Sequence, residues 1–184
     1  MLSRNQALNL IKKYLKEFDN IRLAISVEAI LRKIAEEYDE DKELWGITGL
    51  LHNLDYEYCR SNLENRGIIS NQILNGIIPE KSVNAIKANN YLYNDFIPIS
   101  SLDKCLIAAV TSAELILNIA SYNSLKKLSD ISLSLLITKY NDSSFAPKLK
   151  RNRINICEDV GIDLKSFLEL SLHALYEISD NLLL

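Results

Sequence analysis

Apolar residues recur every three or four positions along most of the chain, which is the spacing of one face of an α-helix. Two such stripes open the sequence, namely Leu8, Ile11, Leu15, Phe18 and then Leu23, Val27, Ile30, Leu31, Ala35. The same spacing predicts helices over residues 41–53, 57–74 with a break near Gly67, 79–91, 101–119, 124–140 and 163–181, and a short helix from Pro147 to Gly161. The pattern therefore predicts an all-α protein, a compact bundle of many helices.

Polar and small residues mark where these helices begin and end. Asp41 and Ser101 stand at predicted helix starts, where a side-chain oxygen can accept from unpaired backbone N–H groups. Pro79 suits a first helical turn and Gly161 suits a left-handed helix end, whereas residues 94–98 are predicted to form a loop. With no internal repeat and no linker, residues 1–184 are predicted to fold as a single domain.

The charge balance argues against a nucleic-acid partner. The chain has a net charge of −3, whereas proteins that bind nucleic acid usually present a strongly basic face. One basic cluster does occur, formed by Lys148, Lys150, Arg151 and Arg153, and acidic residues follow it shortly afterwards. This cluster is either the solvated start of a helix or a phosphate site.

The cysteines and the N-terminus bear on the compartment. Cys59, Cys105 and Cys157 are widely spaced and form no C-x-x-C pair, which favours free thiols in a reducing environment. The first 18 residues are amphipathic, without the continuous apolar core of a signal peptide. No apolar run is expected to reach the roughly 20 residues of a membrane span. The sequence thus predicts a cytoplasmic protein without membrane contact.

Candidate chemistry is concentrated around residues 43–57, where an apolar helix is predicted to end near His52. His52 and Asp55 are three positions apart, so they would share a face if the helix continued. They are either metal ligands or a buried His whose ring N–H is satisfied by the carboxylate. The other histidine, His173, lies midway along the last predicted helix and is interpreted as a structural or surface residue.

The segment L-L-H-N-L-D-Y-E, from Leu50 to Glu57, resembles the L-L-H-D-[IL]-D-Y-E motif of a subgroup of predicted hydrolases in the HD-domain superfamily. Further similarity is found in V-E-A at 27–29, in A-I-K-A-N-N at 85–90 (the family's A-I-[RK]-x-H-N), in the helix 102–116, in S-F-A at 144–146, at Arg151 and in C-E-D-V-G-I at 157–162. The resemblance covers nearly the whole chain and implies an HD-domain-like helical fold. Such enzymes are expected to hold one or two divalent metals that activate water and polarise a phosphoryl oxygen.

Residue by residue, the resemblance places the family's metal-ligand positions at Leu23, His52, Asn53, Arg66, Asn89 and Val110. Only His52 is a competent ligand, because aliphatic side chains donate no electron pair and Arg66 adds a repelling charge. The site is therefore predicted to be degenerate, with no metal or other cofactor and no identified catalytic residue. Leu23 and Val110 are expected to fill its centre in part and to keep it dry. Buried His52 then needs a hydrogen-bond partner, for which Asn89 is favoured over Asn53 and Asp55.

Three hypotheses of function follow. The first is an HD-like protein retained for binding or regulation, in which Arg66 and Arg151 hold a small phosphorylated or nucleotide ligand. The second is an active metal-dependent phosphohydrolase with a divalent ion in a site rebuilt around His52 and Asp55, with help from Glu57 and from Glu28 or Asp95. The third is a protein-interaction module, for which the sequence names no partner.

Overall fold

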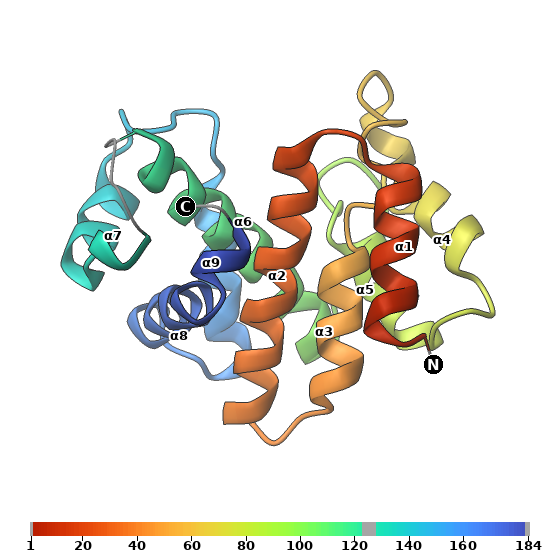
Figure 1. Cartoon of the computed structure of the whole chain (residues 1–184), viewed down its shortest axis with the longest axis horizontal. Coiled ribbons are helices and arrows are strands. Elements are labelled where there is room, and N and C mark those ends of the chain that lie inside the picture. Colours follow the sequence, from red (N-terminus) through yellow and green to blue (C-terminus); the bar gives the residue numbers. More distant parts are fainter. Residues whose placement is uncertain (1, 123–127, 183–184) are drawn as a thin grey trace.

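The computed structural model describes residues 2–122 and 128–182, and these residues form helices and turns without a strand. Figure 1 shows the arrangement of the helices. The α-helices are α1 (Arg4–Tyr14), α2 (Phe18–Glu37), α3 (Lys42–Leu51), α4 (Ile68–Leu74), α5 (Glu80–Ala88), α6 (Ser101–Tyr122), α7 (Leu133–Asn141), α8 (Leu164–Glu177) and α9 (Ser179–Leu182). Three 3₁₀ segments accompany them, η1 (Leu63–Asn65), η2 (Leu128–Asp130) and η3 (Arg151–Val160). The all-α prediction is confirmed.

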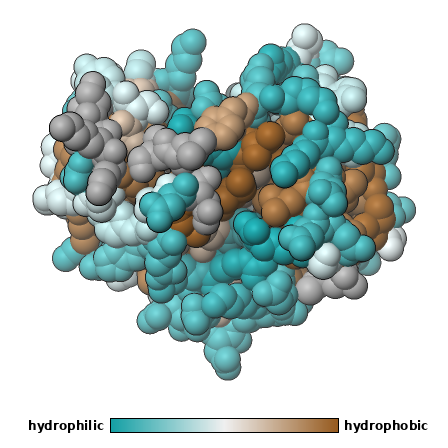
Figure 2. Space-filling model, in the orientation of Figure 1, coloured by the Kyte–Doolittle hydropathy of each residue, from teal (hydrophilic) through white to brown (hydrophobic). Residues whose placement is uncertain are grey.

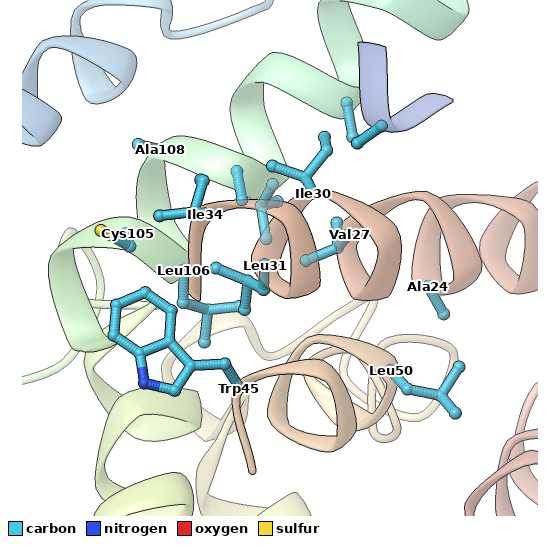
Figure 3. Packing of buried hydrophobic residues seen from close by; sticks show 14 of the residues in the cluster. Ala24, Val27, Ile30, Leu31, Ile34, Trp45, Leu50, Cys105, Leu106 and Ala108 are labelled. Atoms are coloured by element: carbon cyan, nitrogen blue, oxygen red, sulfur yellow. The ribbon is translucent and has the colours of Figure 1, made fainter. Parts of the chain in front are cut away.

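Helix α2 is the centre of the bundle. It packs against α3 most extensively, and against α6 and α8 on its other sides. Figure 3 shows Leu31 of α2 beside Leu106 of α6 and Trp45 of α3, and Ile34 of α2 on the side that faces α6. Burying each aliphatic side chain of this size contributes about 1.5–3 kcal/mol relative to exposure. The buried apolar residues form a single cluster that draws on the chain from Ala7 to Leu182.

Two glycines of α3 allow it to lie close to α2. A Cβ atom on Gly49 would stand 2.9 Å from the carbonyl oxygen of Val27 and 3.1 Å from Cα of Glu28, so the backbones themselves are in contact. A Cβ on Gly46 would instead meet the side chain of Arg32, at 2.5 Å from its Nε atom. Each glycine costs about 1 kcal/mol of helix propensity relative to alanine, which the close packing offsets.

A buried carboxylate connects the first three helices. Glu28 of α2 accepts hydrogen bonds from Nε of Arg4 at 2.7 Å and from Nε of Arg32 at 3.0 Å. Arg32 also pairs with Glu43 of α3, with 2.6 Å between its Nη1 atom and the Glu43 carboxylate. Because the Glu28 side chain is only 3% exposed, both arginines are needed to compensate its lost hydration.

Helix α6 is 22 residues long, and most of its side chains are buried. By length and composition it could cross a membrane, which was not expected from the sequence. However, 78% of its most apolar 18-residue window is buried within the protein, as it is in core helices of soluble proteins. The face of the molecule in Figure 2 is largely hydrophilic, with hydrophobic residues showing mainly in its middle.

Several predicted helix ends are confirmed and others shift. Asp41 caps α3, because its Oδ1 accepts from the backbone N–H of Leu44 at 2.9 Å, and Gly161 ends η3 with a left-handed φ of 82°. The cap of α6 lies one residue before the predicted Ser101. There Ser100 Oγ accepts from the N–H of Asp103, and Asp103 accepts from Ser100 in return.

Other boundaries were wrong by more. Residues 52–61 form successive turns, and the predicted helix over 57–74 is helical only from Leu63 to Asn65 and from Ile68 to Leu74. Helix α5 ends at Ala88 rather than near Tyr91, and Phe18 begins α2 instead of ending the first helix. The segment after Pro147 is a 3₁₀ segment that starts at Arg151. Part of the helix predicted over 124–140 lies outside the described residues, and α7 begins at Leu133.

The two glycines of α3 give a stability prediction. Gly49→Ala should destabilise the protein by about 1–3 kcal/mol, because its Cβ meets backbone atoms that cannot move aside. Gly46→Ala meets a side chain, so in an Arg32→Ala background it should become neutral or stabilising by up to about 1 kcal/mol. Urea unfolding of Gly46→Ala and Gly49→Ala, each alone and in the Arg32→Ala background, measures the loss of stability, with the parent and Arg32→Ala as references. Equal losses for Gly46→Ala and Gly49→Ala in the Arg32→Ala background would contradict the explanation.

Candidate functional site

His52 follows α3 directly and is 4% exposed. Its Nδ1 atom lies 2.7 Å from the carbonyl oxygen of Gly49. A carbonyl can only accept, so Nδ1 carries the ring proton and Nε2 keeps a lone pair. The expectation that Asn89 is the partner of His52 was wrong, because the preceding helical turn already supplies an acceptor. Burial lowers the pKa of His52 to about 4, and the nearby charges of Arg66 and Arg153 act in the same direction, so its ring is neutral at pH 7.

Asp55, proposed as a metal ligand beside His52, has a different set of contacts. Its buried carboxylate accepts from the backbone N–H of Gly67 at 2.7 Å and of Ser70 at 2.9 Å. These N–H groups have no partner within α4, so Asp55 caps the start of this helix, although it lies twelve residues before Gly67 in the sequence.

Glu57 likewise accepts hydrogen bonds from backbone N–H groups, in this case immediately before α2. Its carboxylate accepts from the backbone N–H groups of Lys16 and Glu17 and from the side-chain amide of Asn20, all within 3.1 Å. Partial burial opposes its ionisation, but the hydrogen bonds from Asn20, Glu17 and Lys16 outweigh this and lower the pKa of Glu57. Glu57 therefore fixes the start of α2.

Three further positions at which the resemblance predicts metal ligands have other surroundings. Asn53 donates to the backbone carbonyl of Asn20 at 2.9 Å, while its own buried Oδ1 has no partner among the described residues. Leu23 is half-buried and lines a cavity of about 250 Å³ with the polar residues Asp19, Asn20, Arg22, Glu114, Asn118 and Ser121. Val110 is 4% exposed and packs in the core. Val110 is thus a core residue, whereas Leu23 packs against the core and borders a polar space.

A cavity of about 590 Å³ in the described part of the chain has a strongly basic lining. Its charged residues are Arg66, Lys148, Lys150, Arg153 and Glu114, and the tyrosines Tyr56 and Tyr93 lie beside them. Within residues 2–122 and 128–182, none of the four cations lies within 4.0 Å of a carboxylate oxygen. Four positive charges and one negative charge therefore face the same space.

Arg66 is placed in this lining by the turn that begins α4. Gly67 has a φ of 83°, and a Cβ on it would lie 2.8 Å from Cα of Lys87, so only glycine fits. The Arg66 guanidinium stacks over the ring of Tyr56, with 4.5 Å between its Cζ atom and the ring centroid. Its N–H groups are engaged by no acceptor among the described residues, which leaves them available for a ligand.

Arg153 approaches the cavity from η3. Its Nη2 donates to the backbone oxygen of Asn89 at 2.7 Å and to Oδ1 of Asn89 at 2.8 Å. Burial lowers the pKa of Arg153 from its ordinary value, and its Nε atom is buried without a partner in the described part of the chain. Asn89, which the resemblance places at a ligand position, thus binds the guanidinium of Arg153.

Lys150 and Tyr93 join two loops at the cavity. Lys150 Nζ donates to the Tyr93 hydroxyl at 3.0 Å and lies 4.6 Å from the centre of its ring. This hydrogen bond and the lysine charge lower the pKa of Tyr93.

Arg151, predicted to bind an anion, lies outside the cavity lining. Its guanidinium donates to the backbone carbonyls of Phe145, Ala146 at 3.4 Å and Leu149 at 3.5 Å, so it orders the preceding loop. Arg153 takes the place expected for Arg151. Arg151 is occupied by the carbonyls of the preceding loop, whereas Arg153, three residues after Lys150, lies on the same side of the chain as Lys150 and lines the cavity with it.

Glu114 is the site residue that the sequence analysis missed. It lies on α6 between Thr111 and Asn118, at helical spacing along the cavity wall. Burial raises the pKa of its carboxyl group, although Arg153 and Arg66 oppose the shift. One signal was available, because Glu114 is the only charged residue between Lys104 and Lys126.

Other candidate groups lie apart. Among the described residues, no three His, Cys, Asp or Glu side chains come together in a way that could hold a metal ion. The three cysteines are free and buried, and burial raises the pKa of Cys105 and of Cys157 to about 12. His173 is exposed on α8 beside Tyr176. Asp95 lines a separate cavity with Lys81 and Asp103.

Comparison with known proteins gives no match: neither a family model, nor a curated protein, nor a solved structure is matched by this chain.

His52 gives a pH prediction. Its folded-state pKa of about 4 lies below the ordinary value of 6.5, so the unfolded chain binds the proton more readily. The stability due to neutral His52 is complete above about pH 6.5 and should fall as the pH drops towards 4, by about 2 kcal/mol at about pH 5. His52→Gln keeps a donor for Gly49 but does not titrate. Urea unfolding at about pH 7 and about pH 5 should show that His52→Gln lacks the loss of stability seen in the parent protein. An equal loss of stability in both proteins would contradict the prediction.

Proposed function

We propose that the chain is an HD-domain-like protein without metal-dependent hydrolysis that binds a small phosphorylated or nucleotide ligand in the cavity between Arg66 and Arg153. The observation that carries the proposal is the concentration of four cations, none paired with a carboxylate in the described residues, around one cavity of about 590 Å³. This volume is within the usual range of small-molecule sites, about 300–1,000 Å³.

The charges support an anionic ligand. The lining has a formal charge of +3, from four cations and Glu114, whereas the whole chain has −3. Gathering unpaired cations is unfavourable in the empty site, and a phosphate group removes the repulsion while accepting charge-assisted hydrogen bonds. Arg66 is suited to this because stacking on Tyr56 fixes its plane and leaves its N–H edge free. The tyrosines at the cavity offer aromatic surface beside which the base of a nucleotide fits.

The contacts of the other candidates support a loss of metal chemistry. His52, Asp55 and Glu57 are committed to a backbone carbonyl and to two helix starts. Glu28 is enclosed by two arginines, and Asp95 lies in a different cavity. A metal at a rebuilt site would have to displace contacts that hold α2 and α4.

The binding proposal is tested by titration calorimetry with inorganic pyrophosphate and with a nucleoside monophosphate. Arg66→Gln should weaken binding roughly tenfold to hundredfold, because a charged hydrogen bond contributes about 1.5–3 kcal/mol. Arg60→Gln removes the same charge from an exposed residue that pairs with Glu17, and should leave the affinity unchanged. No binding by the parent protein, or equal affinities for the parent and Arg66→Gln, would contradict the proposal.

The loss of hydrolysis is tested separately. Protein purified without chelators is assayed with phosphate monoesters and Mn²⁺, Mg²⁺ or Zn²⁺, next to His52→Ala. Both proteins should show the same background rate, while His52→Ala loses stability because it removes the buried ring and its hydrogen bond to Gly49. A metal-dependent rate in the parent that disappears in His52→Ala would establish the active phosphohydrolase instead.

A further inference from the structure

Glu114 is a carboxylate in a basic cavity that forms no ion pair. No hydrogen bond or salt bridge of its side chain occurs within residues 2–122 and 128–182, although Arg66 and Arg153 line the same cavity. It also lines the smaller cavity beside Leu23, so it stands where the two spaces meet. A built-in counter-ion would lie in contact with its arginines, and Glu114 does not.

The charged and titratable groups around Glu114 belong to several different segments of the chain. Those lining the two cavities are Asp19 and Arg22 on α2, Tyr56 and Arg66 after α3, Tyr93 after α5, and Lys148, Lys150 and Arg153 towards η3. Asp19 pairs with Arg22 at 2.9 Å, and Lys139 pairs with Asp142 in a third cavity next to Asn118. His52 is neutral at pH 7 and adds no charge. The cations that stabilise an ionised Glu114 are thus the ones proposed to hold the ligand.

An anion in this cavity changes the surroundings of Glu114 in two ways. It neutralises Arg66 and Arg153, whose charges favour the ionised carboxylate, and it adds negative charge beside that carboxylate. Both effects favour the protonated form. A neutral carboxylic acid can donate a hydrogen bond to a phosphate oxygen, whereas a carboxylate can only repel it.

We propose that Glu114 determines specificity as a neutral acid, donating a hydrogen bond to a phosphate oxygen of the ligand, so that the protein takes up one proton from solvent together with the anion. This inference rests on the proposed binding function. It adds that the site binds anions more tightly at acidic pH and that a ligand oxygen able to accept this hydrogen bond is required.

The direction of the pH dependence follows from linkage. The pKa of Glu114 is already raised by burial in the empty protein, and the bound anion raises it further. At a pH below the pKa of Glu114 in both the empty and the ligand-bound protein, Glu114 is protonated with and without the ligand, and the affinity is highest. Between the two values the affinity falls tenfold per pH unit as the pH rises, and above both it is constant and low.

The test is titration calorimetry of inorganic pyrophosphate with the parent protein, Glu114→Gln and the exposed-surface control Glu169→Gln, in buffers of different ionisation enthalpy. Glutamine has the shape and the donor of the protonated acid without its titration. The titrations are run at about pH 5 and about pH 8. The affinity of Glu114→Gln relative to that of the parent should be higher at the alkaline pH than at the acidic pH, by roughly tenfold, because only the parent loses its hydrogen-bond donor as the pH rises. The parent and Glu169→Gln should take up more protons than Glu114→Gln, by up to about one. Protonation of pyrophosphate itself is common to all three and cancels in the comparison.

Three results would overturn the inference. Equal proton uptake by the parent and Glu114→Gln, or a ratio of their affinities that is the same at both pH values, would exclude the neutral donor while leaving anion binding at Arg66 intact. Absence of pyrophosphate binding at both pH values would reject the binding function and this inference together. The variant Arg66→Gln distinguishes these cases. If it weakens pyrophosphate binding while Glu114→Gln gives either of the first two results, the binding function stands and only the role of Glu114 is rejected.

Discussion

The six residues that follow α3, His52 to Glu57, connect distant parts of the molecule through hydrogen bonds to backbone groups far along the chain. Asn53 binds the carbonyl of Asn20, Asp55 caps α4 and Glu57 caps α2. Asp55 and Glu57 satisfy backbone N–H groups at the start of α4 and just before α2, whereas Asn53 adds a second donor to a carbonyl within α2. A backbone group left unpaired costs about 1–3 kcal/mol when it is buried. This segment therefore sets the start of α2, and the start of α4 with Arg66 beside it.

The same constraint explains why the acidic residues of the motif are unavailable for other chemistry. A carboxylate that accepts two helix N–H groups is directed at the positive end of a helix and away from a cavity. Asp55 is 1% exposed and has both bonds below 3 Å. Replacing it would release α4 and Arg66 with it, so the motif has a clear structural function in this chain whether or not a metal was once held nearby.

The helices could be predicted from the sequence, whereas the site could be predicted only in part. Spacing identified α2, α3, α6 and α8 because their apolar faces are long and regular. It failed over residues 52–66, where side chains bond to remote backbone groups that no local pattern reveals. Arg66 was found by its departure from the family motif. Arg153 was named as part of a basic cluster that could be a phosphate site, but Arg151 was singled out from it, because the sequence does not reveal that Arg151 bonds to the carbonyls of the preceding loop.

The position of Glu114 at the cavity is not revealed by the hydropathy pattern of α6. The sequence analysis assigned no role to this acidic residue inside a long apolar helix, yet it borders two cavities while its helical neighbours Leu115 and Ile116 are buried in the core. Arg66 and Arg153 line the same cavity as Glu114, and within the described residues no carboxylate oxygen lies within 4.0 Å of either guanidinium. The charges of these arginines are therefore partly uncompensated. In the proposed binding function, an anion would relieve this electrostatic imbalance, and Glu114 would be the group whose protonation changes.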